Sequence, residues 1–318
     1  MTDPGPSPAD ARRAADAGRA VIVLGMHRSG TSATSRVLNR MGSWLGSESS
    51  VTRRFEHAAV QDTNEEILRS LGGRWHTPPD LTDGWTEEPA LRALDEPART
   101  ALADLQGHPV FSWKDPRTCF TLPWWERHLG APPVVVYVYR HPTEVAASLA
   151  TRNGFGAAHA LMMWEAYNGA ALRAAAGHRV ITMPYSQLVD APTETAAVLH
   201  EALTEWGLPL TADPESAVAE VTSDRRHHQA PPELDPEIAT PGQTRLWSRV
   251  QDLPRVSDSF VPPTVDPMHA ATVELLAGRR IALRQQEELA TRNQLLRSRR
   301  ALVRLLLHPD EARRPRPA

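Results

Sequence analysis

The stretch AVIVLGMHRSGTS, residues 20–32, places a short apolar run directly before a loop rich in glycine and hydroxyl side chains. The residues that follow, Ala33–Met41, favour a helix. A short, nearly continuous apolar run is typical of a strand buried on both faces, so the segment predicts a strand, a loop and a helix in that order. Such a unit is the usual beginning of an α/β fold.

Three further apolar runs predict buried strands at Pro109–Trp113, Val134–Tyr139 and Arg179–Met183. Helical patterns occur between or after these runs, at Ala59–Leu71, Pro89–Leu105, Thr143–Thr151, Ala157–Ala176 and Thr193–Glu205. Strands that alternate with helices usually form one parallel sheet through right-handed crossovers, so the pattern predicts a three-layer α/β/α fold. The first strand, loop and helix make the predicted fold similar to that of the P-loop NTPases.

The 318 residues divide by composition into four segments. Residues 1–19 are rich in proline, alanine and charge, which predicts a disordered tail. Residues 20–210 carry the strands and helices of the core. Proline-rich connections over residues 211–267 indicate an irregular covering segment. Residues 268–318 predict a mostly helical C-terminal extension, as one helix or as two that break near Gly278.

Composition and charge exclude several classes of protein. The chain is 41% hydrophobic and 23% charged, as in ordinary globular proteins. Its one cysteine, Cys119, cannot support a disulfide framework. A net charge of −3 provides no overall basic field, so we expect no nucleic-acid partner. No apolar run approaches the ~20 residues that span a bilayer, and residues 1–19 lack the apolar region of a signal peptide, so we expect a cytoplasmic protein without a membrane span.

The loop at residues 25–32, GMHRSGTS, has the features of a phosphate-binding site. Backbone N–H groups and a helix N-terminus would converge there on one anion. Compared with the nucleoside-triphosphate pattern G-x-x-x-x-G-K-[ST], Thr31 replaces the lysine, and the cation lies inside the loop as Arg28. The residues that we expect to contact phosphate are His27, Arg28, Ser29, Gly30, Thr31 and Ser32.

A second anion site is expected where the apolar run at residues 134–139 is followed by Arg140. In P-loop enzymes that bind Mg²⁺, a corresponding strand commonly ends in aspartate. An arginine suits an anion directly. Ser148 lies eight residues later on the next predicted helix, where its hydroxyl could join Arg140 around one phosphate. Two anion sites without the lysine or the aspartate imply a nucleotide with phosphates at two separate positions.

The pairing of GMHRSGTS with YRHPTEVAAS, residues 139–148, resembles the sulfotransferases that use 3′-phosphoadenosine 5′-phosphosulfate (PAPS). In that family the first loop wraps the 5′-phosphosulfate, and an arginine and a serine eight positions apart bind the 3′-phosphate, which implies these roles for Arg140 and Ser148. The stretch MPYSQLVDAP, residues 183–192, is similar to the family's Y-x-x-L segment. The resemblance covers roughly Val21 to Pro209. It implies PAPS as co-substrate, 3′-phosphoadenosine 5′-phosphate (PAP) as product, and no metal.

The resemblance also implies transfer of SO₃ from PAPS to a hydroxyl or amine of a small-molecule or glycan acceptor. Such a transfer needs cations near the bridging oxygen and usually a base for the acceptor proton. Arg28 is the first candidate to stabilise charge on the leaving phosphate, in a loop where the eukaryotic cytosolic members carry lysine. Lys114, the only lysine in the chain, ends a predicted parallel strand and would lie at the carboxyl edge of the sheet, where ligands bind.

Three residues are candidates for the base. Glu56 lies in RRFEH, residues 53–57, which resembles the F-E element of bacterial family members, and it is the favoured candidate. Asp115, beside Lys114, and His57 are the alternatives. Asp115 precedes a proline and could instead orient a neighbouring cation.

Two later segments carry many basic side chains. The run DRRHH, residues 224–228, could close over the nucleotide through Arg225 and Arg226. The C-terminal helix is rich in arginine from Arg279 to Arg304 and could serve oligomerisation or a partner. Several of the nine tryptophans could stack on a glycan or aromatic acceptor, among them Trp44, Trp75, Trp85, Trp113, Trp124 and Trp125.

Two other functions stay open on the sequence. A P-loop kinase or NTPase would share the first loop but is disfavoured by Thr31 and Arg140. A nucleotide-binding scaffold protein without catalysis would keep the phosphate sites and use the C-terminal helix for a partner. The acceptor and the oligomeric state have no signature in the sequence.

Overall fold

The computed structural model describes residues 19–219 and 234–307. The chain divides into two units, Met1–His269 and Ala270–Ala318. The first is an α/β unit, and the described part of the second is one helix, α12 (Ala270–Leu307). A parallel sheet between helical layers and a helical C-terminal extension confirm the predicted fold class. None of the described helices combines the length and the apolar character needed to cross a bilayer.

Five strands form one sheet in the order β2-β1-β3-β4-β5. They are β1 (Arg19–Leu24), β2 (Val110–Lys114), β3 (Val134–Tyr139), β4 (Arg179–Pro184) and β5 (Val256–Ser257). The first four are parallel, and β5 pairs with β4 in the antiparallel direction. Every residue of β3, and every residue of β1 after the first, is buried, as expected for strands that are covered on both faces.

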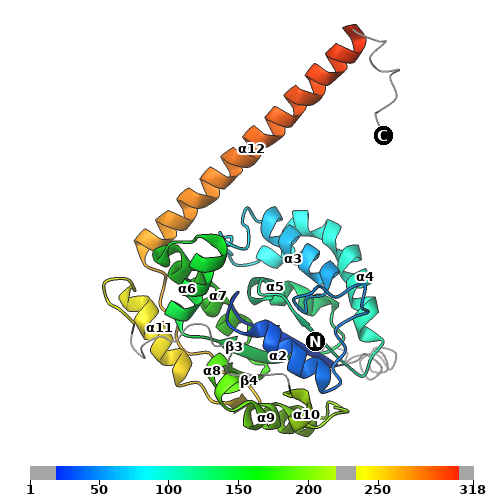
Figure 1. The fold of residues 1–318 in the computed structure, drawn as a ribbon, viewed down its shortest axis with the longest axis vertical. Helices are drawn as coiled ribbons and strands as arrows, with labels where there is room; N and C mark the ends of the chain where they lie inside the picture. Colours follow the sequence, from blue (N-terminus) through cyan, green and yellow to red (C-terminus); the bar gives the residue numbers. More distant parts are fainter. Residues whose placement is uncertain (1–18, 220–233, 308–318) are drawn as a thin grey trace, which may run out of the picture. The chain divides into compact units, whose positions relative to one another are not determined.

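Helices cover both faces of the sheet and complete the three layers (Figure 1). One face packs against α2 (Thr31–Arg40), α8 (Tyr185–Asp190), α9 (Pro192–Glu205) and α10 (Pro214–Ala217). The other packs against α3 (Ala58–Ser70), α4 (Asp95–Gln106), α5 (Thr118–Trp125), α6 (Pro142–Asn153), α7 (Ala157–Ala174) and α11 (Pro241–Gln251). Short 3-10 helices lie at Trp85–Glu87, Pro89–Leu94 and Glu126–His128.

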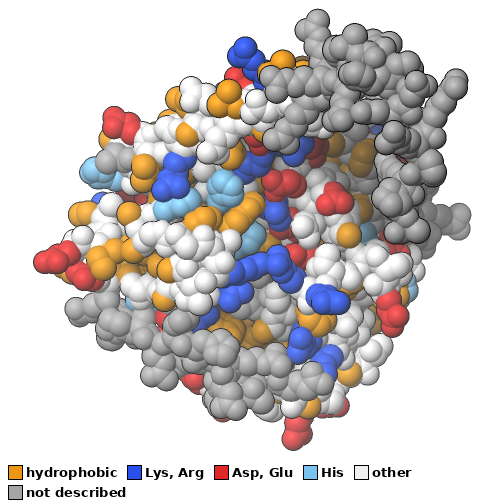
Figure 2. Space-filling model, turned by 45° about the horizontal axis from the view of Figure 1, so that its top comes forward, with side chains coloured by type: hydrophobic (Ala, Val, Ile, Leu, Met, Phe, Trp, Pro, Cys, Tyr) orange, Lys and Arg blue, Asp and Glu red, His pale blue; other side chains and the backbone are white. Residues whose placement is uncertain are grey.

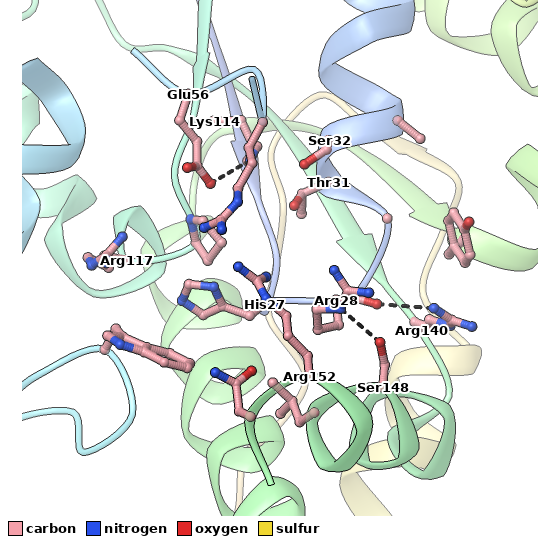
Figure 3. Close-up of a pocket in the computed structure, with 18 of the residues that line it drawn as sticks. His27, Arg28, Thr31, Ser32, Glu56, Lys114, Arg117, Arg140, Ser148 and Arg152 are labelled. Carbon is pink, nitrogen blue, oxygen red and sulfur yellow. Dashed lines mark hydrogen bonds and ion pairs between the residues drawn. The ribbon is translucent and has the colours of Figure 1, made fainter. Parts of the chain in front are cut away.

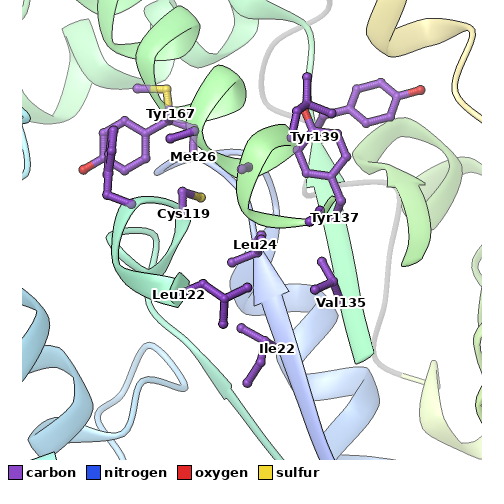
Figure 4. Close-up of a cluster of buried hydrophobic side chains, with 14 of the residues drawn as sticks. Ile22, Leu24, Met26, Cys119, Leu122, Val135, Tyr137, Tyr139 and Tyr167 are labelled. Carbon is purple, nitrogen blue, oxygen red and sulfur yellow. The ribbon is translucent and has the colours of Figure 1, made fainter. Parts of the chain in front are cut away.

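The side chains of β1 divide between two hydrophobic cores. Val21 and Val23 lie in one cluster with residues of α2 and α9, whereas Ile22 and Leu24 lie in the other with residues of α5 and α7 (Figure 4). This alternation follows from the period of two in a strand. Because all four side chains are completely buried, a shift of one residue would place each set in the wrong core. The packing therefore fixes where the loop after β1 begins.

Helices α5, α8, α10 and α11 lie where the sequence predicts none. Helix α5 contains Pro123 and several β-branched or aromatic residues, but all its other residues are buried, and packing overrides their weak helix propensity. Helix α11 lies in the segment expected to be irregular; it begins at a capping box of Thr240 and Gln243, with Pro241 at its first position. The C-terminal pattern forms one helix through Gly278, since a single glycine costs a helix only about 1 kcal/mol.

Cys119, in α5, should keep its proton in the folded protein. Burial raises the pKa of its thiol to about 12, although the Gly25 N–H donates a hydrogen bond to the sulfur at 3.2 Å. An unfolded thiol has a pKa of about 8.5. Above that pH the unfolded thiol loses its proton while the folded thiol keeps it, so the free energy of unfolding should fall as the pH rises. We expect the free energy of unfolding to fall by about 1.4 kcal/mol more in the wild type than in Cys119→Ala between about pH 7.5 and pH 9.5. Urea unfolding measures both losses, and equal losses would show that the folded thiol ionises normally.

Candidate active site

The carboxyl ends of the four parallel strands meet at one cavity, of about 840 Å³. The loop after β1 contributes His27 and Arg28, β2 ends in Lys114, β3 is followed by Arg140, and β4 is followed by Tyr185. Ligands of open α/β sheets bind at this edge, where the strand order reverses. Since β1 lies between β2 and β3, its loop occupies the middle of the site (Figure 3).

The loop between β1 and α2 takes a conformation that few residues tolerate. Gly30, directly before α2, has a φ of 95°, and a side chain there would collide with the Tyr185 ring. Arg28 also has a positive φ, of 72°, which is uncommon outside glycine and tends to be kept at functional sites. Its Nε donates a hydrogen bond to Ser148 Oγ at 2.7 Å. The strained backbone thus directs Arg28 toward helix α6.

The start of α2 offers several donors to an anion. The first N–H groups of a helix have no acceptor within it, and no side chain caps α2. His27 Nε2, Ser29 Oγ and Arg140 Nη2 are buried atoms without a hydrogen-bond partner among the described residues. Such orphaned groups cost free energy unless something satisfies them. Of the six loop residues predicted from the sequence, His27, Arg28, Gly30, Thr31 and Ser32 line the cavity, and Ser29 is fully buried.

Arg140 is fixed beside the loop by three contacts. Its Nε donates to Glu144 Oε2 at 2.6 Å, and its Nη1 donates to the Arg28 carbonyl oxygen at 3.3 Å. Its guanidinium also lies 4.8 Å from the centroid of the Tyr185 ring. The sequence predicts that Ser148 joins Arg140 around one phosphate; both line the cavity, but the Ser148 hydroxyl is bonded to Arg28. The two predicted anion sites therefore form one continuous site.

Glu56 and Lys114 form a buried ion pair on the wall of the cavity. Lys114 Nζ donates to Glu56 Oε1 at 2.7 Å, and the Lys114 and Glu56 side chains are 2% and 8% exposed, respectively. Burial lowers the pKa of Lys114, and the opposing effect of Glu56 is smaller. No other hydrogen bond to this carboxylate occurs within residues 19–219 and 234–307, so Oε2 is free to accept a proton. A carboxylate and an ammonium group thus face the same space.

The two alternative bases lie elsewhere. Asp115 Oδ1 accepts from Arg117 Nη1 at 2.8 Å, and Oδ2 accepts from Asn64 Nδ2 at 3.0 Å, so both its oxygens are engaged. His57 caps α3, where its Nδ1 accepts a backbone N–H at 3.4 Å, and its Nε2 lies 3.1 Å from Asp104 Oδ2. Neither residue is among those that line the cavity. The structure brings only Glu56, of the three predicted candidates, to the cavity wall.

The ring of His27 should be uncharged at neutral pH. Burial, followed by the nearby charges of Arg117 and Lys114, holds its pKa well below the usual range. The centroid of the ring lies 4.8 Å from that of Trp75 and 5.4 Å, edge to face, from that of Tyr167. Trp75 itself is partly exposed and lines the cavity. It therefore offers a flat apolar surface to a ligand.

Phe55 also has a positive φ, of 59°, and in the described part of the chain it shares this property with one other non-glycine residue, Arg28. A bulky side chain in this conformation is rare. The Arg36 guanidinium lies 4.8 Å from the centroid of the Phe55 ring and holds it in place. The turn brings both neighbours of Phe55, Arg54 and Glu56, to the cavity. Local backbone strain is thus found in two segments that shape this site.

Three cations line the cavity without having been predicted as site residues, namely Arg54, Arg117 and Arg152. Arg152 lies four residues after Ser148 on α6. Because residues at i and i+4 share one face of a helix, the sequence contains a signal that places Arg152 beside Ser148. Arg54 and Arg117 lie outside the regular elements, where no such periodicity exists.

Cations dominate the described lining of the cavity. It contains Arg28, Arg54, Lys114, Arg117, Arg140 and Arg152 against one carboxylate, that of Glu56. Figure 2 shows Lys and Arg side chains gathered near the middle of one face of the molecule. Within the described ranges, no group of three or more His, Cys, Asp or Glu side chains could hold a metal ion. Arg225 and Arg226, which were predicted to close over a nucleotide, lie outside the described residues. The lining suits a ligand with several negative charges.

The solved structures that are similar to this chain include two sulfotransferase domains. One is the sulfotransferase domain from the Synechococcus PCC 7002 olefin synthase, with 15% identity and a TM-score of 0.40 over 82% of this chain and 94% of that one. The other is the sulfotransferase domain from the curacin biosynthetic pathway, with 15% identity and a TM-score of 0.38 over 82% of this chain and 97% of that one. No family model and no curated protein matches the chain. At this identity and these TM-scores, the likeness transfers no function.

Proposed function

We propose that this chain is a sulfotransferase, which transfers the sulfuryl group of PAPS to a hydroxyl or amine of a small-molecule or glycan acceptor. The observation that carries the proposal is the composition of the cavity at the carboxyl edge of the sheet. A phosphate-binding loop without the usual lysine and a strand end that carries Arg140 surround it, and Glu56 faces it from a buried pair with Lys114. Each of these features has a use in sulfuryl transfer.

The two ends of the donor would bind at different parts of the cavity. The N–H groups at the start of α2, together with Arg28 and Ser29, would bind the 5′-phosphosulfate. Arg140 and Ser148 would bind the 3′-phosphate. Two of the orphaned atoms at this site, Ser29 Oγ and Arg140 Nη2, fit the assignment, because anionic oxygens would accept hydrogen bonds from them.

The reaction breaks the bond between sulfur and the bridging oxygen of the donor and forms a bond between sulfur and the acceptor atom. The electron pair of the broken bond stays on the phosphate oxygen of PAP, whose growing charge Arg28 and Lys114 would stabilise. The acceptor would lose its proton to Glu56 Oε2. Because Lys114 donates to the other carboxylate oxygen, it would hold Glu56 correctly turned for this step.

The alternative functions fit less well. A P-loop kinase or NTPase usually holds Mg²⁺ with an acidic residue at the end of a neighbouring strand, and here that strand leads into Arg140. A scaffold protein has no evident use for the Glu56–Lys114 pair, because a buried ion pair contributes little to stability compared with apolar residues. The pair is better explained by chemistry at the cavity.

Thermal unfolding with PAP, with ADP, and with ATP plus Mg²⁺ tests the proposed function. PAP at about 100 times its Kd should add about 2.7 kcal/mol of stability, which is a shift of several degrees for a chain of this size. ADP lacks the 3′-phosphate and should give a smaller shift. Arg140→Ala should lose the difference between PAP and ADP. Stabilisation by ATP plus Mg²⁺ but not by PAP would instead point to phosphoryl transfer.

A further inference from the structure

Two cations of the cavity, Arg54 and Arg152, have no polar side-chain partner in the described part of the chain. Both line the cavity, and neither guanidinium forms a hydrogen bond or ion pair with another described residue. The other cations are engaged: Lys114 with Glu56, Arg117 with Glu65 and Asp115, Arg140 with Glu144, and Arg28 with Ser148. An arginine presents a planar fork of donors that matches two oxygens of an anion. Arg54 and Arg152 can therefore bind a ligand without first breaking a contact within the protein.

Arg152 lies near the C-terminal end of α6, one turn beyond Ser148 and away from Arg140. A helix rises 1.5 Å per residue, so the Arg152 backbone is about 12 Å along α6 from Glu144, which holds Arg140. In Figure 3 the Arg152 side chain lies near His27, and Arg140 lies on the other side of Arg28. A nucleotide whose 3′-phosphate contacts Arg140 would have its 5′ end toward His27 and Arg152, with Ser148 between the two ends.

Arg54 reaches the same cavity from a separate segment. It precedes Phe55, whose positive φ brings both Arg54 and Glu56 to the cavity wall. The guanidinium thus shares a short, strained turn with the proposed base. Such a turn persists only where the surrounding structure fixes it, here through the contact between Arg36 and the Phe55 ring.

The positive charges of both arginines reach the phosphate loop. Burial is the largest cause that lowers the pKa of Arg28, and the charge of Arg152 is the next largest. Arg152 and Arg54 also contribute, after burial and two other cations, to the low pKa of His27. Charges shift a pKa in this way only at short range. Both arginines also line the cavity together with His27 and Arg28 of the loop that would hold the 5′-phosphosulfate.

We propose that Arg54 and Arg152 bind the oxygens of the sulfuryl group during its transfer and are two further catalytic residues. This inference rests on the proposed function. It assigns different roles to the cations. Arg140 would hold the nucleotide, and these two arginines would contact only the sulfuryl group, which leaves the nucleotide in the reaction. They neither gain nor lose a proton. The S–O bond to PAP breaks, the bond to the acceptor forms, and the guanidinium groups stabilise the negative charge on the sulfuryl oxygens throughout.

A comparison of PAP with PAPS isolates the sulfuryl group, since PAP shares every other part of the donor. The variants are Arg54→Gln, Arg152→Gln and the double variant, and the matched control is Arg53→Gln. Arg53 is exposed, adjoins Arg54 and is not among the residues that line the cavity. Calorimetry gives the Kd of each nucleotide, and the release of PAP from PAPS, with water as acceptor, gives a rate that needs no knowledge of the natural acceptor.

We expect each Gln variant to weaken PAPS binding by about 10- to 100-fold and to change the Kd of PAP by less than about threefold. The rate of PAP release should fall by about 100-fold or more. Arg53→Gln should match the wild type in all three measurements. The melting temperature without nucleotide should match the wild type in every variant, which separates loss of a contact from loss of the fold.

Two results would overturn the inference while leaving the proposed function intact. Equal losses for PAP and PAPS would show that the arginines bind the nucleotide itself. Unchanged affinities and an unchanged rate would show that they contact neither part of the donor. A wild-type protein that binds neither PAP nor PAPS would be a different failure, because it would contradict the proposed function before any variant is compared.

Discussion

Replacing Glu56 by glutamine should lower the rate of PAP release from PAPS by about 10²–10⁴-fold, the usual contribution of a general base. Glutamine has the same shape, and its carbonyl oxygen can still accept a hydrogen bond from Lys114, which now donates at 2.7 Å. The variant cannot take up the proton of the acceptor. Among the described residues the Glu56 carboxylate bonds to Lys114 and not to the phosphate loop, Arg140 or Ser148, so the Kd of PAP should change by only a few fold.

Asp115→Asn is the control for this variant, because Asp115 is the alternative base beside the same lysine. Its carboxylate is bonded to Arg117 and Asn64 and does not line the cavity. We expect its effect to fall mainly on stability, measured by urea unfolding, since it would disturb a buried network. Normal turnover in Glu56→Gln, with a large loss of turnover in Asp115→Asn, would indicate that Asp115 and not Glu56 is the base.

The sheet could be predicted from the sequence because its parallel strands are short apolar runs. The predicted run at residues 134–139 coincides with β3, and β1 begins one residue before its predicted start. Strand β5 has two residues and no apolar pattern, so it exists through its pairing with β4 and leaves no signal in the sequence. Helix α5 was missed for a related reason, because burial decides its conformation and propensity does not.

The candidate site was predictable where a strand or a helix fixes the position of a residue. Arg140 and Lys114 follow from the ends of strands, and Arg152 could have followed from its helical spacing to Ser148. The loop at Phe55 is different. The conformation that brings Arg54 and Glu56 to the cavity depends on a positive φ in a bulky residue, which local preference disfavours. Tertiary contacts decide such a turn, so the pairing of Glu56 with Lys114 could not be derived from spacing.

Lys114→Met should destabilise the protein by about 3–5 kcal/mol, the usual effect of removing one partner from a buried ion pair. Methionine resembles lysine in length and adds no cavity, so the loss comes from the Glu56 carboxylate, which is left 8% exposed without its counter-ion. Urea unfolding at neutral pH measures this effect. The rate of PAP release should also fall, because the variant lacks the ammonium group proposed to stabilise the leaving phosphate.

Replacing Glu56 and Lys114 together by methionine shows why the chain keeps the pair. Apolar residues of similar volume in place of a buried ion pair are often neutral or stabilising, so the double variant should recover most of the stability that Lys114→Met loses. Its rate of PAP release should stay at least as low as that of Glu56→Gln. Recovered stability without recovered turnover would mean that the pair serves the reaction. If the double variant were as unstable as Lys114→Met, the pair would be a structural element, and the assignment of Glu56 as the base would lose its main support.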